Sequence, residues 1–121
     1  MKKGDTMSEF LKIRMDFDEI GQKAHLISEK NMEYSDLVNI LIQLDYIFED
    51  QQSVNFRDPV ILFNSKQKQN SNKEYFDTWE QNKYSYYMYH CKYPAHVLHW
   101  LIAEREYVLE CVKGKKNLVE E

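Results

Sequence analysis

The chain contains 121 residues, about the length of one domain, and that is enough to bury a hydrophobic core without metal or disulfide support. Hydrophobic residues make up 43% and charged residues 30%, a balance that excludes both an intrinsically disordered chain and a membrane protein. The formal net charge of −4 is ordinary for a soluble protein and is not typical of a dedicated binder of DNA or anionic membranes.

Residues that interrupt regular structure are few. With three glycines and two prolines, the composition favours long helices over a turn-rich sandwich or barrel, and we predict a single all-α domain over residues 1–121. The N-terminal residues lack the apolar stretch of a signal peptide. The longest apolar run, from Val60 to Phe63, is far too short to span a membrane. These features predict a cytoplasmic protein without membrane contact.

The first predicted helix covers residues 7–31. Thr6 and Glu9 have the spacing of a capping box, which marks a helix start. Gly21 lies inside this helix, where glycine costs about 1 kcal/mol relative to alanine, so we expect a bend there. Apolar residues recur at alternating spacings of three and four, as on one face of a helix: Phe10, Ile13, Phe17, Ile20, Ala24 and Ile27.

The second predicted helix begins at Ser35 or Asp36 and ends near Asp50. Its buried stripe consists of Leu37, Ile40, Leu41, Leu44, Ile47 and Phe48. A short element follows near 59–64, where Asp58 and Pro59 suit a helix start. Its four apolar residues are too few to distinguish a helical turn from a short strand by periodicity. We favour the helical turn, and the strand is the alternative.

Residues 64–72 are polar and lack apolar anchors, which predicts a flexible surface loop. Ser71 and Glu74 form a second capping-box pattern, so we expect a third helix to begin there. This helix carries the aromatic-rich part of the chain. It ends at Pro94, because proline cannot continue a helix from its interior.

The last predicted helix follows Pro94 and stops at Lys113 and Gly114, a basic last turn followed by a glycine. Its apolar face consists of Val97, Leu98, Leu101, Ile102, Val108, Leu109 and Val112. Residues 115–121 are expected to fray. The predicted architecture is a small bundle of four main helices, with a short extra helical turn or strand near 59–64.

Cysteines and histidines are the residue types of this chain that most often bind a transition metal. Cys91 and Cys111 lack the paired spacing of a zinc site or a disulfide framework, which indicates reduced thiols. His90, His96 and His99 lie near Cys91, and such residue types can bind zinc. No carboxylate belongs to this group, however, and His-x-x-His without a glutamate is not a metalloprotease motif. We therefore predict structural histidines and no metal site.

Sequence motifs for catalysis are missing. No serine lies in a Gly-x-Ser-x-Gly elbow, and the isolated glycines form no phosphate-binding loop. The acidic residues of the first two predicted helices lack the Glu-x-x-His pattern of a di-metal carboxylate site. We therefore expect a non-enzymatic protein without a cofactor.

The most unusual feature is an aromatic tract between Tyr75 and Trp100, which holds nine of the seventeen aromatic residues. A helix buries about one stripe, so tyrosines spread around its circumference must partly face outward. Tyrosine tolerates such a position and is enriched at recognition surfaces. The predicted partner-binding residues are Trp79, Lys83, Tyr84, Tyr86, Tyr87, Tyr89 and Tyr93.

Three interpretations of this tract stay open: core packing, a protein-binding face that includes self-association, and a stacking platform for single-stranded nucleic acid. We predict a small cytosolic protein-binding module that acts by steric binding. Its size and acidity suit an inhibitor, an immunity protein or a counter-defence factor, and its Asn- and Lys-rich composition suits a bacterial or phage genome. The alternative is a helical nucleic-acid-binding regulator that uses the lysine and tyrosine tract 66–93.

Overall fold

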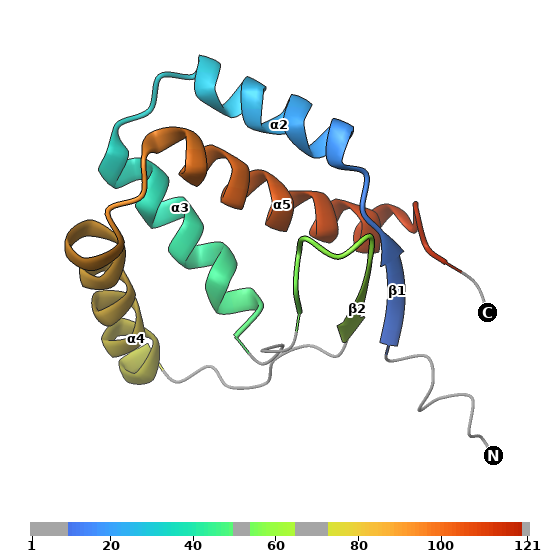
Figure 1. The fold of residues 1–121 in the computed structure, drawn as a ribbon. Helices are drawn as coiled ribbons and strands as arrows, with labels where there is room; N and C mark the ends of the chain where they lie inside the picture. Colours follow the sequence, from blue (N-terminus) through green and yellow to red (C-terminus); the bar gives the residue numbers. More distant parts are fainter. Residues whose placement is uncertain (1–9, 50–53, 65–72, 120–121) are drawn as a thin grey trace.

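The computed structural model describes residues 10–49, 54–64 and 73–119, and this part of the chain is mostly helical with a small two-stranded sheet (Figure 1). The elements in chain order are β1 (Phe10–Arg14), α2 (Phe17–Glu29), α3 (Tyr34–Ile47), β2 (Val60–Asn64), α4 (Lys73–Ser85), the π-helix η1 (Tyr86–Cys91) and α5 (Ala95–Gly114). The prediction of a small helical bundle is therefore confirmed in part, and the prediction that the fold is all-α is wrong.

The long helix α5 is the centre of the fold. It packs against α2 on one side and against α3 on the other, while α4 and η1 lie along the far side of α3 (Figure 1). The part of α5 that is buried consists of Leu98, Ile102, Ala103, Glu104, Tyr107, Val108 and Cys111. In the described ranges, no helix combines the length and the apolar character that crossing a membrane requires.

The first predicted helix is replaced by a strand and a shorter helix. In β1 the exposed and buried side chains alternate, with Lys12 and Arg14 outward and Ile13 inward. This period of two suits a strand, and it competes with the three-four spacing on which the helix 7–31 was predicted. Helix α2 starts only after Asp16, whose carboxylate accepts a hydrogen bond from the Glu19 amide at 3.1 Å. Thr6 and Glu9 lie outside the described residues.

The element near 59–64 is also a strand, and the helical turn that we favoured is wrong. Strand β2 pairs with β1 in antiparallel register, with Ile13 opposite Ile61 and Leu11 opposite Phe63. Ile61 and Phe63 are buried, whereas Val60 and Leu62 are exposed. The apolar run had no period of its own, and pairing with β1 decides its conformation because it satisfies the backbone groups of both strands.

The segment after α5 was predicted to fray, but residues 117–119 pair with the second edge of β1. The Arg14 amide donates to the Asn117 carbonyl at 2.8 Å, and the Val119 amide donates to the Lys12 carbonyl at 2.8 Å. Between them Ile13 and Leu118 form a bridge. Helix α5 ends at Gly114 as predicted, and the left-handed residue that closes it is Lys115, with φ of 54°. The C-terminal segment thus belongs to the fold.

Helices α3 and α4 begin close to their predicted positions. The residue that caps α3 is Glu33, without a side-chain capping hydrogen bond, whereas Ser35 and Asp36 lie inside the first turn. Helix α3 ends at Ile47, and Ile47 is exposed although it was predicted to be buried. Ser71, the predicted cap of the third helix, and nearly all of the predicted loop 64–72 lie outside the described residues.

The buried Tyr107 joins the sheet to the helices. Its hydroxyl donates to the Arg14 carbonyl at 2.7 Å and accepts from Asn117 Nδ2 at 2.7 Å and from the Asp16 amide at 3.2 Å. One hydroxyl of α5 therefore holds the end of β1, the start of α2 and the C-terminal segment together. Burial raises the pKa of Tyr107, so the hydroxyl stays protonated and can donate.

We expect Tyr107→Phe to lower the free energy of unfolding by about 1–3 kcal/mol, because it removes the hydrogen bonds that a buried hydroxyl makes to three segments. Chemical denaturation followed by circular dichroism measures this loss. Tyr89→Phe, at an exposed position, is the control and should change stability by less than about 0.5 kcal/mol. If the Tyr107→Phe variant were as stable as the wild-type chain, the hydroxyl would not hold these segments together.

Gly21 lies inside α2, and the helix continues through it. A Cβ atom at this position would lie 3.7 Å from Trp100 Cζ3, an ordinary van der Waals distance. We therefore expect Gly21→Ala to raise the free energy of unfolding by about 1 kcal/mol through helix propensity. Gly114→Ala, at the end of α5 with no atom near the new methyl group, should gain less. A loss of stability on Gly21→Ala would show that the contact with Trp100 requires a glycine.

Candidate functional site

The aromatic tract forms α4 and the π-helix η1, which follow each other without a break. A π-helix is rare and is frequently found at functional sites. Its wider turn is closed by Lys92, whose amide donates to the Tyr87 carbonyl at 3.2 Å and whose φ is 51°. The chain then leaves the helix, and Pro94 caps α5. The predicted single helix up to Pro94 is thus an α-helix, a π-helix and a short corner.

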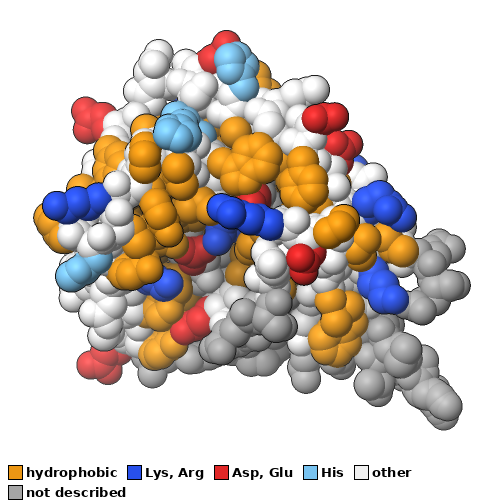
Figure 2. Space-filling model, viewed as in Figure 1, with side chains coloured by type: hydrophobic (Ala, Val, Ile, Leu, Met, Phe, Trp, Pro, Cys, Tyr) orange, Lys and Arg blue, Asp and Glu red, His pale blue; other side chains and the backbone are white. Residues whose placement is uncertain are grey.

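Three tyrosines in η1 and the corner that follows it are exposed. Tyr89 is 65% exposed, Tyr86 is 46% exposed and Tyr93 is 37% exposed. We call these three residues the tyrosine face. Figure 2 shows hydrophobic side chains gathered on the side of the molecule where α3, α4 and η1 lie. Rigid rings held on a fixed backbone offer large contact area at low cost in conformational entropy.

The other predicted binding residues have different positions. Tyr87 is 7% exposed and belongs to the core. Tyr84 is half-buried and borders a hollow between α3 and α4, together with Asn39 and Glu80. Trp79 is half-buried against α3, where its ring lies 5.1 Å from the ring of Tyr46. These three residues anchor α4 and η1 rather than adding to the tyrosine face.

Lys83 lies among the rings. Its Nζ atom is 5.7 Å from the ring centre of Trp79, 5.7 Å from that of Tyr86 and 5.9 Å from that of Tyr87. Such distances allow cation–π attraction. Within the described residues Lys83 forms no ion pair, so its positive charge stands beside the tyrosine face.

Cys91 lies between the exposed tyrosines at the end of η1. Hydrogen bonding to its side chain is the main cause that raises the pKa of Tyr86 and the pKa of Tyr93. Tyr34 of α3 donates from its hydroxyl to the Tyr93 carbonyl at 2.7 Å. The corner after η1 is therefore held from two sides, and both cysteines of the chain are free thiols.

A buried ion pair between α3 and α5 supports η1. Arg105 of α5 donates from Nε to Asp45 Oδ1 of α3 at 2.7 Å, and both side chains are less than 15% exposed. The Tyr87 hydroxyl donates to the other oxygen of Asp45. Arg105 also donates to the Leu101 carbonyl and lies 4.7 Å above the ring of Phe56. The three elements α3, η1 and α5 thus meet at one carboxylate.

Glu104 extends this network into the core. Trp100 donates from Nε1 to Glu104 Oε2 at 2.7 Å, and Arg105 Nη1 lies 3.3 Å from Oε1. Burial raises the pKa of Glu104, whereas the hydrogen bond from Trp100 and the charge of Arg105 act in the opposite direction. Asp45, Glu104 and Arg105 were not among the predicted site residues. Asp45 in particular lies outside the predicted buried stripe of its helix, and no periodic signal distinguishes it from a solvated acid.

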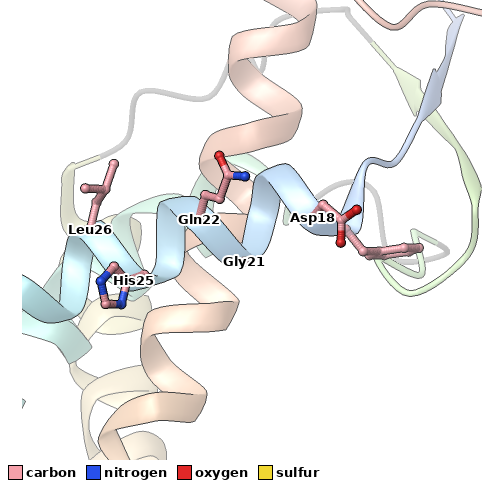
Figure 3. A pocket seen from close by; sticks show the side chains of 6 residues that line it. Asp18, Gly21, Gln22, His25 and Leu26 are labelled. Carbon is pink, nitrogen blue, oxygen red and sulfur yellow. The ribbon is translucent and has the colours of Figure 1, made fainter.

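Besides the hollow at Tyr84, the described surface includes two others. One, of about 510 Å³, is lined by residues of α3, α4 and α5 and the loop before β2, including Asp45, Phe56, Trp79, Lys83 and Arg105. The other, of about 690 Å³, runs along the outer side of α2 past Asp18, Gln22, His25 and Leu26 (Figure 3). Its described lining comes from one helix, and His25 already pairs with Glu29 at 3.0 Å. The α2 hollow therefore presents no group of side chains arranged for catalysis.

The histidines near Cys91 do not assemble a metal centre in the described ranges 10–49, 54–64 and 73–119. There, no three His, Cys, Asp or Glu side chains come together in a way that could hold a metal ion. His96 lies close enough to His99 to lower its pKa, although burial is the larger cause.

Comparisons with protein-family models, with curated proteins and with solved structures gave no match to this chain.

We expect Tyr87→Phe to lower the free energy of unfolding by about 1–3 kcal/mol, because it removes the hydrogen bond to the buried Asp45 carboxylate. Tyr89→Phe should leave stability unchanged, because its side chain is mostly exposed. Thermal unfolding of the two variants side by side measures the difference. Equal melting temperatures would show that the Tyr87 hydroxyl does not help to hold η1.

Proposed function

We propose that the protein is a non-enzymatic binding module that recognises another protein through the tyrosine face. The observation that supports this most is the contrast within one short element: Tyr87 is buried, whereas its neighbours Tyr86 and Tyr89 are exposed on a backbone that Tyr87 and Asp45 hold in place. Exposed aromatic rings that packing does not explain are typical of protein-recognition surfaces.

The mechanism that we propose is steric binding. Tyrosine rings at the centre of an interface act as anchors that fill pockets on the partner, and a few such residues supply most of the binding energy. Binding of this kind would block the surface of the target. This suits the inhibitor, immunity or counter-defence role that we predicted, and a second copy of the chain is included among the partners.

A nucleic-acid-binding regulator is the second candidate. It is favoured by Lys83, whose ammonium group lies beside the exposed ring of Tyr86, since stacking rings next to cations bind single strands. Lys66 and Lys68 of the predicted tract 66–93 lie outside the described residues. The net charge of −4 opposes binding to a polyanion, so we place this function second.

The test uses a photo-cross-linking amino acid at His90, which is exposed on η1. In cells of the natural host, we expect the chain to cross-link to at least one protein, and Tyr86→Ser with Tyr89→Ser should reduce that product about tenfold or more. Phe17→Ser with Leu26→Ser is the matched control, because it removes two exposed apolar side chains from α2.

Thermal unfolding of both double variants shows whether the fold is kept. A folded Tyr86→Ser, Tyr89→Ser variant that cross-links to the same proteins in the same amounts would contradict the proposal. The same holds if no protein cross-links to the wild-type chain. Cross-linking to nucleic acid in place of protein would favour the second candidate.

A further inference from the structure

The surface around η1 has an unusual charge distribution. Between Glu80 and Glu104 the chain contains no aspartate and no glutamate, although twenty acidic residues occur in the whole sequence. The same stretch holds Lys83, Lys92 and three of the four histidines. It forms the end of α4, all of η1 and the first half of α5, so the tyrosine face lies inside it.

Several of these groups are at the surface. Lys92, His90 and His96 are exposed around the corner between η1 and α5, and Lys83 lies beside Tyr86. Arg105 and Arg57 also lie near this corner. Their positive charges lower the pKa of Tyr93 and so oppose the rise caused mainly by the hydrogen bond to Cys91. The charged side chains of the chain that act on the Tyr93 hydroxyl therefore include two arginines.

Neighbouring elements bring carboxylates near this surface, but the inner ones are largely buried and bonded to groups inside the protein. Asp45 binds Arg105, and Glu104 binds Trp100 and Arg105. Helix α3 begins beside Tyr93, because the Tyr34 hydroxyl donates to the Tyr93 carbonyl. The cap residue Glu33 and Asp36 of the first turn are exposed at this border. The stretch from Lys83 to Lys92 thus carries lysines and aromatic rings without a carboxylate of its own. Its border with α3 is acidic, because Glu33 and Asp36 are exposed there and Lys83 shares a hollow with Asp45 and Glu49.

We infer that the tyrosine face binds an acidic segment of a partner protein, in which carboxylates pair with Lys83 and Lys92 while apolar side chains pack on Tyr86 and Tyr89. This inference rests on the proposed function and adds the chemistry of the partner. Complementary charge selects the partner and sets its orientation, and burial of the tyrosine rings supplies the affinity. A basic partner would be repelled at the centre of the face.

An acidic polypeptide fits these observations better than a nucleic acid. Tight binding to a phosphate backbone requires many lysine or arginine contacts, and each one adds to the dependence on salt. The described face offers two lysines, while Arg105 is already bound to Asp45 and Glu104. A few carboxylates with apolar neighbours match two lysines and exposed rings.

The experiment titrates the full chain with short synthetic peptides and follows amide chemical shifts by NMR. One peptide alternates glutamate with leucine, and two others of equal length carry glutamine or lysine in place of glutamate. An oligo(dT) strand of the same length is the fourth probe. We expect the glutamate peptide to shift residues 83–96 in a saturable way and to bind about tenfold tighter than the lysine peptide.

A matched pair of variants locates the charge. Lys83→Gln with Lys92→Asn should weaken binding of the glutamate peptide about three- to tenfold. Lys113→Gln with Lys115→Asn removes the same charge from the other end of α5 and should change nothing. The pairs are equivalent, because each contains one helical lysine and one left-handed lysine that follows a helix. Asparagine tolerates that left-handed conformation.

Each other outcome overturns the inference. These outcomes are equal binding of the glutamate and lysine peptides, an equal loss in both variant pairs, tighter binding of oligo(dT), or no saturable shift with the glutamate peptide. Failure here is distinguishable from failure of the proposed function. If cross-linking at His90 still captures a partner that depends on Tyr86 and Tyr89, the chain binds a protein, and only the acidic nature of the contact is wrong.

Discussion

The Asp45–Arg105 ion pair is the interaction on which the arrangement of the tyrosine face depends. Both groups are largely buried, and each has further partners: the Tyr87 hydroxyl for Asp45, and the Leu101 carbonyl and Glu104 for Arg105. A buried pair adds little net stability over an apolar replacement, but loss of one partner is costly because it leaves a buried charge alone. This geometry determines how η1 lies against α3 and α5.

Tyr87 connects this buried ion pair to the exposed tyrosines. Tyr87 bonds to Asp45 and lies against Tyr86 and Tyr93, whose rings are 5.5 Å and 6.3 Å from its own. Lys83 and Cys91 add contacts to the same rings. Tyr86 and Tyr93 are therefore ordered by a buried network, which would lower the entropic cost of the proposed binding.

The sheet end of the molecule depends on a second device, the Tyr107 hydroxyl. It joins the end of β1 and the start of α2 to the C-terminal segment, which is far from both along the chain. Two buried tyrosines of the chain thus position separate parts of the fold, while other tyrosines are exposed. Residue type alone did not separate these roles, because a tyrosine has both an apolar ring and a polar hydroxyl.

The sequence by itself determined that most of the chain is helical, that α5 ends near Gly114 and that some tyrosines near residue 86 are exposed. Periodicity and composition are local signals and are sufficient for these features. The tertiary structure alone decided that residues 10–14 and 60–64 are strands. The two strands are stable through pairing with each other, and β1 also pairs with residues 117–119, which no local pattern reveals. It also decided which tyrosines are buried, since the partner of Tyr87 is an aspartate 42 positions away.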